Sequence, residues 1–234
     1  MIPLRDANPI RRRPVVTLAI MTACFAIFGL ELMVQATGGE PGLETFYRAY
    51  GVVPVDLLEA VNEGRLLSQP VLALIAHQFL HGGWFHIGSN MLYLWIFGNN
   101  VEDRLGRPAY LLFYLAGGVV AALAQVAIDP ASDIPLVGAS GAIAAVLGAY
   151  FVLFPRARVL SIVFVVVFFQ LIEVPAVLVL GLWFLLQVID GLASLGATEI
   201  VGGVAIFAHI GGFVAGMLLG LLVRLRNPRP VHAG

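Results

Sequence analysis

The amino-acid sequence predicts an all-α polytopic membrane protein, a bundle of six transmembrane helices with both termini in the cytoplasm. Composition is the first indication: 60% of the 234 residues are hydrophobic and only 12% are charged, whereas soluble domains carry roughly 25% charged residues. The second is a series of apolar runs, several of which reach the roughly 20 residues that a helix needs to cross a bilayer. The third is the position of the arginines, which sets the number and direction of the spans.

The distribution of arginine decides between six spans and seven. Positive residues gather on the cytoplasmic side of a membrane, and the chain contains no lysine. Six spans leave only Arg48 and Arg65 outside. If residues 159–169 formed a seventh span, the C-terminal arginines would move outside and the arginine-free loop 190–199 would move in. Six spans are therefore expected, with these arginines in the cytoplasm: Arg5, Arg11, Arg12, Arg13, Arg104, Arg107, Arg156, Arg158, Arg224, Arg226 and Arg229.

The first span is expected at 14–36, directly after a basic cytoplasmic segment, 1–13, that ends in three arginines. A cleaved signal peptide is the alternative, since small residues follow the apolar run. This run is longer than the core of a usual signal peptide, which favours a span. Residues 37–70 form the only long polar stretch, and the apolar residues at 46–61 predict short interfacial helices.

The second span is expected at 84–101, after a loop at 71–83 that dips into the outer face of the membrane. Pro108 suits the first turn of the third span, where its missing N–H costs nothing. Residues 159–169, which are dense in Val, Ile and Phe, can form either helix or extended chain. The later spans are expected at 108–128, 139–154, 172–189 and 200–223, and all six make one domain, 14–226, followed by a short cytoplasmic tail, 227–234.

Polar residues interrupt three of these apolar runs near their outer ends. His86 and Asn90 lie early in the second span, Ser140 begins the fourth, and His209 lies early in the sixth. Since all three spans run from outside to inside, their first turns lie at similar depth and these side chains can meet. Small residues recur every four positions on the fourth and sixth spans, which lets two helices pack closely in lipid. The glycines of these ridges include Gly141, Gly212 and Gly216.

The four polar residues suit acyl transfer by serine. A serine hydroxyl needs a base to take its proton, and His209 can be that base. A carboxylate at this depth would be costly, so a Ser-His pair is more plausible in a membrane than a full triad. His86 and Asn90 lie on one helical face and can donate hydrogen bonds to the oxyanion of a tetrahedral intermediate, together with the backbone N–H of Ser140.

Three motifs follow one another on the second, fourth and sixth spans, and a fourth occupies the turn after the second span. They are His-x-x-x-Asn at His86 and Asn90, Gly-x-Ser-Gly at Gly138 to Gly141, Ala-His-x-x-Gly at Ala208 to Gly212, and Glu-x-x-x-Gly at Glu102 and Gly106. In this order the motifs resemble the rhomboid family of intramembrane serine proteases, over most of the chain from His77 to about Gly220. One motif alone is a weak signal, whereas the ordered set is specific.

The resemblance implies a six-helix rhomboid-like bundle and cleavage of single-span membrane proteins in or near their transmembrane segments. It implies Ser140 as nucleophile, His209 as general base, and His86 and Asn90 as oxyanion donors, while the glycines of the motifs and Glu102 are structural. Some members carry an aromatic residue four positions after the nucleophile, stacked on the catalytic histidine, where this chain has Ala144. The Trp-Arg pair that some members carry in the first loop is absent.

Two other classes of function remain open. A catalytically silent relative would bind transmembrane helices for quality control, which the presence of both Ser140 and His209 disfavours. A small transporter or proton channel would carry paired ionisable residues through the membrane centre, where this chain has almost none. The structural alternatives are that Ser140 is a simple N-cap and that His86 and Asn90 form hydrogen bonds between helices.

No cofactor, metal or nucleic acid is expected. A metal would need a carboxylate or thiolate beside His77, His81 and His86, and the only cysteine, Cys24, lies in the first span. His77 and His81 are expected to line a polar entrance for water. Trp183 and the two residues after it are candidates for a lateral gate, with the loop 190–203 as a cap.

The expected partners are the lipid bilayer and single-span transmembrane proteins as substrates. The arginine-rich N-terminus without a long transit segment favours the inner (plasma) membrane of a bacterium. The sequence leaves the oligomeric state open.

Overall fold

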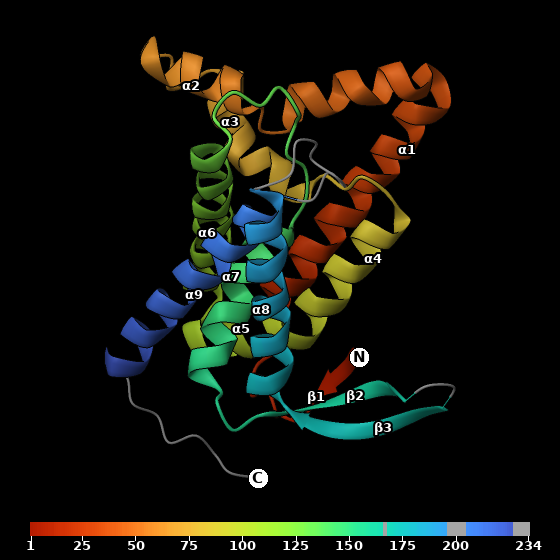
Figure 1. Cartoon of the computed structure of the whole chain (residues 1–234), viewed down its shortest axis with the longest axis vertical. Coiled ribbons are helices and arrows are strands. Elements are labelled where there is room, and N and C mark those ends of the chain that lie inside the picture. Colours follow the sequence, from red (N-terminus) through yellow and green to blue (C-terminus); the bar gives the residue numbers. More distant parts are fainter. Residues whose placement is uncertain (166–167, 196–204, 227–234) are drawn as a thin grey trace.

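The chain folds into a bundle of helices with a three-stranded sheet at one end (Figure 1). This computed structural model describes residues 1–165, 168–195 and 205–226. Among these residues, four helices are long and apolar enough to cross a membrane, as expected of a polytopic helical protein. They are α1 (Val15–Tyr50), α6 (Arg107–Ile128), α8 (Ala176–Ser194) and α9 (Ile206–Arg226).

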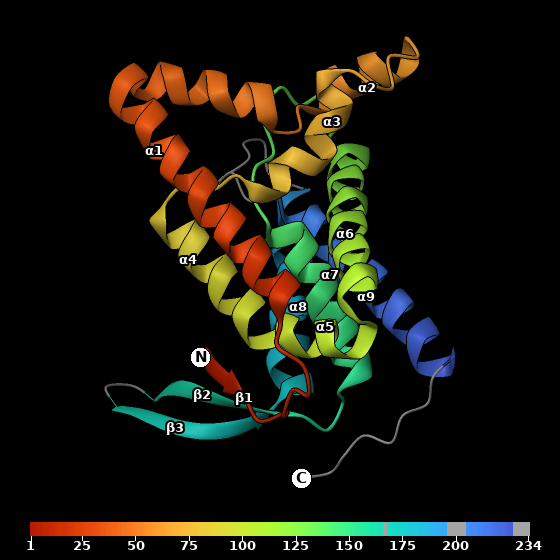
Figure 2. The same ribbon diagram turned by 180° about the vertical axis from the view of Figure 1, so that it is seen from behind.

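Two shorter segments correspond to the other expected spans. The helix α7 (Ser140–Leu153) has 14 residues and packs against α6 and α9 in the interior of the bundle (Figure 2). The second segment is a continuous run of α4 (Trp84–Tyr93), the π-helical turn η2 (Leu94–Gly98) and α5 (Asn99–Leu105). A π-helical turn interrupts the regular hydrogen bonding of an α-helix, so this span is one helix in three parts.

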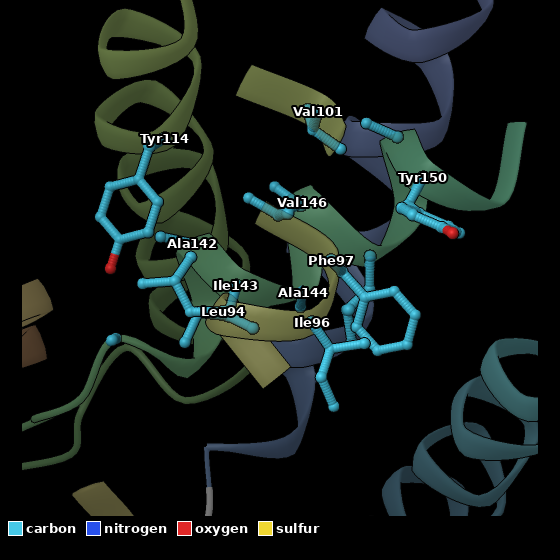
Figure 3. Close-up of a cluster of buried hydrophobic side chains, with 14 of the residues drawn as sticks. Leu94, Ile96, Phe97, Val101, Tyr114, Ala142, Ile143, Ala144, Val146 and Tyr150 are labelled. Atoms are coloured by element: carbon cyan, nitrogen blue, oxygen red, sulfur yellow. The ribbon is translucent and has the colours of Figure 1, made fainter. Parts of the chain in front are cut away.

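Part of the hydrophobic core lies where α7 meets this second segment. The Phe97 ring packs edge-on against that of Tyr150, with ring centroids 4.9 Å apart. Ile96 lies beside Phe97 near Ala144, and Leu94 lies beside Ala142 and Ile143 (Figure 3). Because α7 is buried on all sides, its mostly small residues allow its neighbours to approach closely.

The contact between α7 and α9 depends on glycine. A Cβ on Gly216 would overlap the carbonyl oxygen of Ala145 and lie 2.8 Å from its Cα, and a Cβ on Gly148 would lie 2.9 Å from the backbone nitrogen of Met217. No side chain fits in either place. The small-residue ridges expected from the sequence therefore bring the two backbones together.

The helix α1 extends well beyond the predicted first span, 14–36. Gly39 has a φ of 62°, a left-handed conformation that glycine adopts readily. The kink there turns the last part of the helix across the end of the bundle, toward α2 (Pro54–Asn62) (Figure 1). The predicted interfacial helices thus include the last turns of α1 itself.

Residues 71–83 were expected to form a loop, and the first part of this prediction is wrong. The helix α3 (Gln69–Ala76) begins beside Pro70, which suits a first helical turn, and continues as the short 3-10 helix η1 (His77–Phe79). Only the residues from Leu80 to Gly83 connect to α4 without helical structure. The eight residues of α3 make about two helical turns at 3.6 residues per turn.

Glu102 fastens α5 to the beginning of α1. Its Oε1 accepts a hydrogen bond from the backbone N–H of Val16 (3.0 Å), and its Oε2 accepts from the N–H and the hydroxyl of Thr17 (both 2.8 Å). Unpaired N–H groups and the helix dipole favour an anion at a helix N-terminus. Glu102 thus lies in α5 but caps the N-terminus of α1. Gly106, with a φ of 83°, makes the sharp turn from α5 into α6.

The sheet consists of β1 (Ile2–Asp6), β2 (Arg158–Val165) and β3 (Phe168–Pro175) in this order, with both pairings antiparallel. The described residues of the Val- and Ile-rich segment, 159–165 and 168–169, are therefore extended, which is one of the two alternatives left open by the sequence. The fifth span does not begin at 172, because residues up to Pro175 pair with β2. It begins at Ala176 instead.

The strand β1 is joined to the helical bundle by polar contacts with α7. Tyr150 OH donates a hydrogen bond to Asp6 Oδ2 (2.7 Å) and accepts one from Asn8 Nδ2 (3.0 Å). Asp6 is buried, and burial raises the pKa of its carboxyl to about 6. The sheet is thus attached to the same helix that begins with Ser140.

The arginine-rich segments lie at one end of the bundle. The sheet, the turn after α5 and the C-terminal end of α9 share this end, whereas α2, α3 and the turned part of α1 lie at the opposite end (Figures 1 and 2). Arg48 and Arg65 belong to the opposite end, as the arginine distribution predicted. Arg229, the first residues of the predicted sixth span (200–204) and most of the predicted cap loop lie outside the described residues.

Candidate active site

Ser140 and His209 lie side by side near the arginine-poor end of the α7–α9 contact. Ser140 is the first residue of α7, and His209 lies in the first turn of α9. Ser140 Oγ is 2.8 Å from His209 Nε2, which is a hydrogen-bonding distance. This approach also depends on glycine, because a Cβ on Gly212 would lie 3.2 Å from the carbonyl carbon of Gly141 and 3.3 Å from Ala144 Cβ.

His86 lies across the site from His209, against Gly138. Gly138 has a φ of 134°, and a Cβ there would be 2.8 Å from His86 Cε1 and Nε2 and 3.6 Å from Ser140 Oγ. The backbone N–H of Gly82 donates a hydrogen bond to His86 Nδ1 (3.2 Å). In a neutral ring the proton is then on Nε2, the nitrogen that faces Gly138.

Asn90 lies one turn after His86 on the same face of α4. Its side chain is buried, with 6% of its surface exposed, and its Nδ2 has no hydrogen-bond partner among the described residues. Buried amides usually find partners. The amide of Asn90 is thus a donor without a partner in the described part of the chain, one turn after His86, but Asn90 itself does not line the cavity that Ser140, His209 and His86 share.

A cavity of about 520 Å³ joins these groups. Ser140, His209 and His86 line it, together with residues from the arginine-poor end that include Pro54, the first residue of α2, and Ser132 of the loop after α6. A cavity of this size is within the usual range for binding sites. The serine hydroxyl therefore lies in a cavity that is reached from the end of the bundle opposite the arginines.

The helix α8 supplies two further contacts to His209. Gln187 Oε1 is 2.6 Å from His209 Nδ1, and the Trp183 ring lies with its centroid 5.9 Å from that of His209 at an interplanar angle of 38°. Gln187 was not among the residues selected from the sequence, and Trp183 was considered only for a gate. Their spacing of four residues, in a run that is otherwise apolar, was the available signal.

His77 and His81 are buried and do not line this cavity, so the expectation of a polar entrance between them is wrong. His77 Nδ1 is 3.0 Å from the carbonyl oxygen of Ala73, and the carbonyl of His77 accepts a hydrogen bond from the N–H of Gly138 (2.9 Å). The N–H of His81 donates to Glu31 Oε1 (3.0 Å). His77 thus fixes the backbone of Gly138, two residues before Ser140, and His81 is tied to α1 through Glu31.

Comparison with known proteins gives a consistent result. The Rhomboid domain family matches residues 68–226 of the chain. The chain is similar to Rhomboid protein 1, mitochondrial, of Saccharomyces cerevisiae, with 26% identity over 84% of this chain and 51% of that protein. It is also similar to Rhomboid protease GluP of Bacillus subtilis, with 35% identity over 50% of this chain and 21% of that protein.

A third relative is the human Presenilin-associated rhomboid-like protein, mitochondrial, with 33% identity over 44% of this chain and 27% of that protein. The chain spans about half or less of the length of these relatives. The family match itself covers well over half of this chain and includes all four motifs. The chain therefore belongs to the rhomboid family.

Proposed function

We propose that the chain is an intramembrane serine endopeptidase that cleaves peptide bonds in or near the transmembrane segments of membrane proteins. The observation that carries this proposal is the 2.8 Å distance between Ser140 Oγ and His209 Nε2 at the wall of a cavity. A hydroxyl in contact with a histidine base is the minimum required for an activated serine. The similarity to a relative named as a protease supports the same reading.

The reaction follows from these two side chains. As Ser140 Oγ attacks the carbonyl carbon of the scissile bond, its proton passes to His209 Nε2 and a tetrahedral intermediate forms. The intermediate collapses, the C–N bond breaks, and His209 gives the proton to the departing amine. Water then attacks the acyl-enzyme with His209 again as base, which releases the acid and restores the serine.

The oxyanion of each tetrahedral intermediate needs donors on the opposite side of Ser140 from the base. His86 Nε2–H, the amide of Asn90 and the backbone N–H of Ser140 are the candidates. Ser140 is the first residue of α7, so its N–H has no carbonyl partner within the helix. Donors that are in place before the reaction typically contribute a factor of about 10² to 10³ in rate.

Single-span membrane proteins in a bilayer are the substrates that suit this site. The helices around it expose apolar side chains that face lipid, so a substrate helix can approach without leaving the membrane. We propose the inner membrane of a bacterium as the location, on the basis of the arginine-rich N-terminal segment. The relatives come from mitochondria as well as from a bacterium, so cleavage assays should include bilayers of both lipid compositions.

Cleavage of a model single-span protein in proteoliposomes tests the proposal. The wild-type chain should cleave it, whereas Ser140→Ala and His209→Ala should lose activity by at least about 10³-fold, as expected when a nucleophile or its base is removed. Ser161→Ala is the matched control, because Ser161 lies in β2 and donates only to the carbonyl of Val159. It should cleave at the wild-type rate.

A fluorophosphonate probe gives a second readout that needs no substrate. It should label the wild-type chain at Ser140 and leave the Ser140→Ala variant unlabelled. If the wild-type chain neither reacts with the probe nor cleaves any of several single-span proteins, the protease proposal fails. Binding of transmembrane helices without cleavage would then favour a helix-binding protein, and ion flux would favour a transporter.

A further inference from the structure

His209 has contacts on both of its ring nitrogens. Nε2 faces Ser140 Oγ at 2.8 Å, and Nδ1 faces Gln187 Oε1 at 2.6 Å. The second contact comes from α8, a helix that the sequence motifs do not include. It is close to the position in which a serine protease triad has its carboxylate.

The chemistry of the amide determines where the ring proton lies. In the orientation that the structure gives Gln187, its carbonyl oxygen faces Nδ1 and can only accept a hydrogen bond, so in this arrangement Nδ1 carries the proton and donates it. A neutral imidazole has one such proton, which leaves Nε2 bare and able to accept the hydroxyl proton of Ser140. Contact with Gln187 therefore selects the one tautomer of His209 that can act as a base toward Ser140.

A neutral amide suits this depth better than a carboxylate. A charged side chain within the membrane costs several kcal/mol, which limits carboxylates in such positions. The amide holds the same ring nitrogen without that cost. The ring of Trp183, one helical turn before Gln187, lies against the imidazole and restricts its plane. The aromatic residue that some family members carry four positions after the nucleophile is replaced by Ala144 in this chain.

We propose that Gln187 is a positioning residue for the base, and that Ser140, His209 and Gln187 act together as a Ser-His-Gln triad. This inference rests on the proposed protease function, because it assigns a role within that reaction. It also gives α8 a second role. Movement of α8 away from α9 would release both contacts to His209, so a substrate must reach Ser140 while α8 is still in place.

The first test compares Gln187→Met with the wild type by cleavage kinetics in proteoliposomes. Methionine is similar in length and apolar, so it preserves packing while removing the acceptor. We expect kcat to fall about 10- to 100-fold with KM changed less than 3-fold, because Gln187 does not line the cavity that holds Ser140. Leu186→Met is the matched control on the same helix, at a position that faces lipid. It should have wild-type kinetics.

The second test reads the tautomer directly and needs no activity. The 15N chemical shifts of a histidine ring distinguish a protonated nitrogen from a bare one, and the signal of His209 is identified by its loss in His209→Ala. In the Ser140→Ala background, Gln187 alone should keep the proton on Nδ1. Adding Gln187→Met should move a measurable fraction of it to Nε2.

The outcomes separate the two proposals. If the wild-type chain has no serine reactivity but the tautomer depends on Gln187, the protease proposal fails and the positioning of His209 is still supported. If the wild-type chain cleaves, and Gln187→Met leaves both kcat and the tautomer unchanged, the triad is refuted while the Ser-His pair remains. Thermal unfolding of each variant shows whether a loss of activity reflects unfolding, and Gln187→Leu then replaces Gln187→Met.

Discussion

Replacing Gly216 by alanine should separate α9 from α7 and disable the site from a distance. A Cβ on Gly216 would overlap the carbonyl oxygen of Ala145 and lie 2.6 Å from its carbonyl carbon and 2.8 Å from its Cα. Ordinary contact needs at least 3.4 Å. These atoms belong to the backbone of a buried helix and cannot move aside, so α9 must shift by about 1 Å at this point.

His209 lies seven residues before Gly216, or roughly 10 Å along the helix at 1.5 Å per residue. A shift of about 1 Å that reaches His209 would lengthen its 2.8 Å contact with Ser140 beyond hydrogen-bonding distance. Misplacement of this size costs about 10²-fold in rate. The overpacked contact should also lower the stability by about 1–3 kcal/mol.

Gly220→Ala is the matched control, one turn further along the same ridge. A Cβ on Gly220 would lie 3.0 Å from Ala149 Cα and 3.2 Å from its carbonyl oxygen, so a shift of a few tenths of an ångström would accommodate it. This variant should keep most of its activity. Cleavage rates in proteoliposomes, fluorophosphonate labelling rates and thermal unfolding in detergent are the measurements. Equal labelling and equal stability of Gly216→Ala and Gly220→Ala would refute the reasoning.

Three further predictions concern the site and the two attachments of the N-terminal part of the chain. Gly138→Ala should push His86 away from Ser140 and strain the backbone at a φ of 134°, with a fall of at least about 10-fold in kcat and a loss of about 1–3 kcal/mol in the free energy of unfolding. Glu102→Gln leaves a single amide oxygen to accept from three donors, the N–H of Val16 and the N–H and hydroxyl of Thr17. The free energy of unfolding, followed by thermal unfolding, should fall by about 2–3 kcal/mol. Burial raises the pKa of Asp6 from 3.8 to about 6, so its contribution to stability is complete below pH 3.8 and lost as the pH rises through about 6. Amide exchange of β1 should therefore show protection factors that fall as the pH rises from 3.8 to about 6 in the wild type and level off above it, and that stay level throughout in Asp6→Asn.

The proximity of Ser140, His209 and His86 could be predicted because it depends on few facts. Spans of the same direction place their first residues at the same end, and the arginines fix that direction. Glycine spacing then indicates which helices approach most closely. These rules concern single helices and pairs of helices, and they need no knowledge of rotation about each helix axis.

The contribution of α8 could not be predicted in this way. Whether Gln187 faces His209 or lipid depends on the rotation and tilt of α8 against α9, which an apolar run does not encode. The partner of Glu102 was missed for a related reason, since a carboxylate can cap any helix N-terminus within reach and here the nearest one belongs to α1. The pairing of β1 with β2 joins segments that are far apart in the chain, and no local sequence pattern predicts it.

The hydrogen bond between Asp6 and Tyr150 joins residues that are 144 positions apart, which has a consequence for the order of events during synthesis. Ribosomes add about 5–20 residues per second, so Asp6 waits roughly 7–30 s before Tyr150 is made, and β2 follows later still. All residues of α1 to α6 precede Tyr150 in the chain and are therefore made before it. Closure of the sheet is thus a late step in biogenesis.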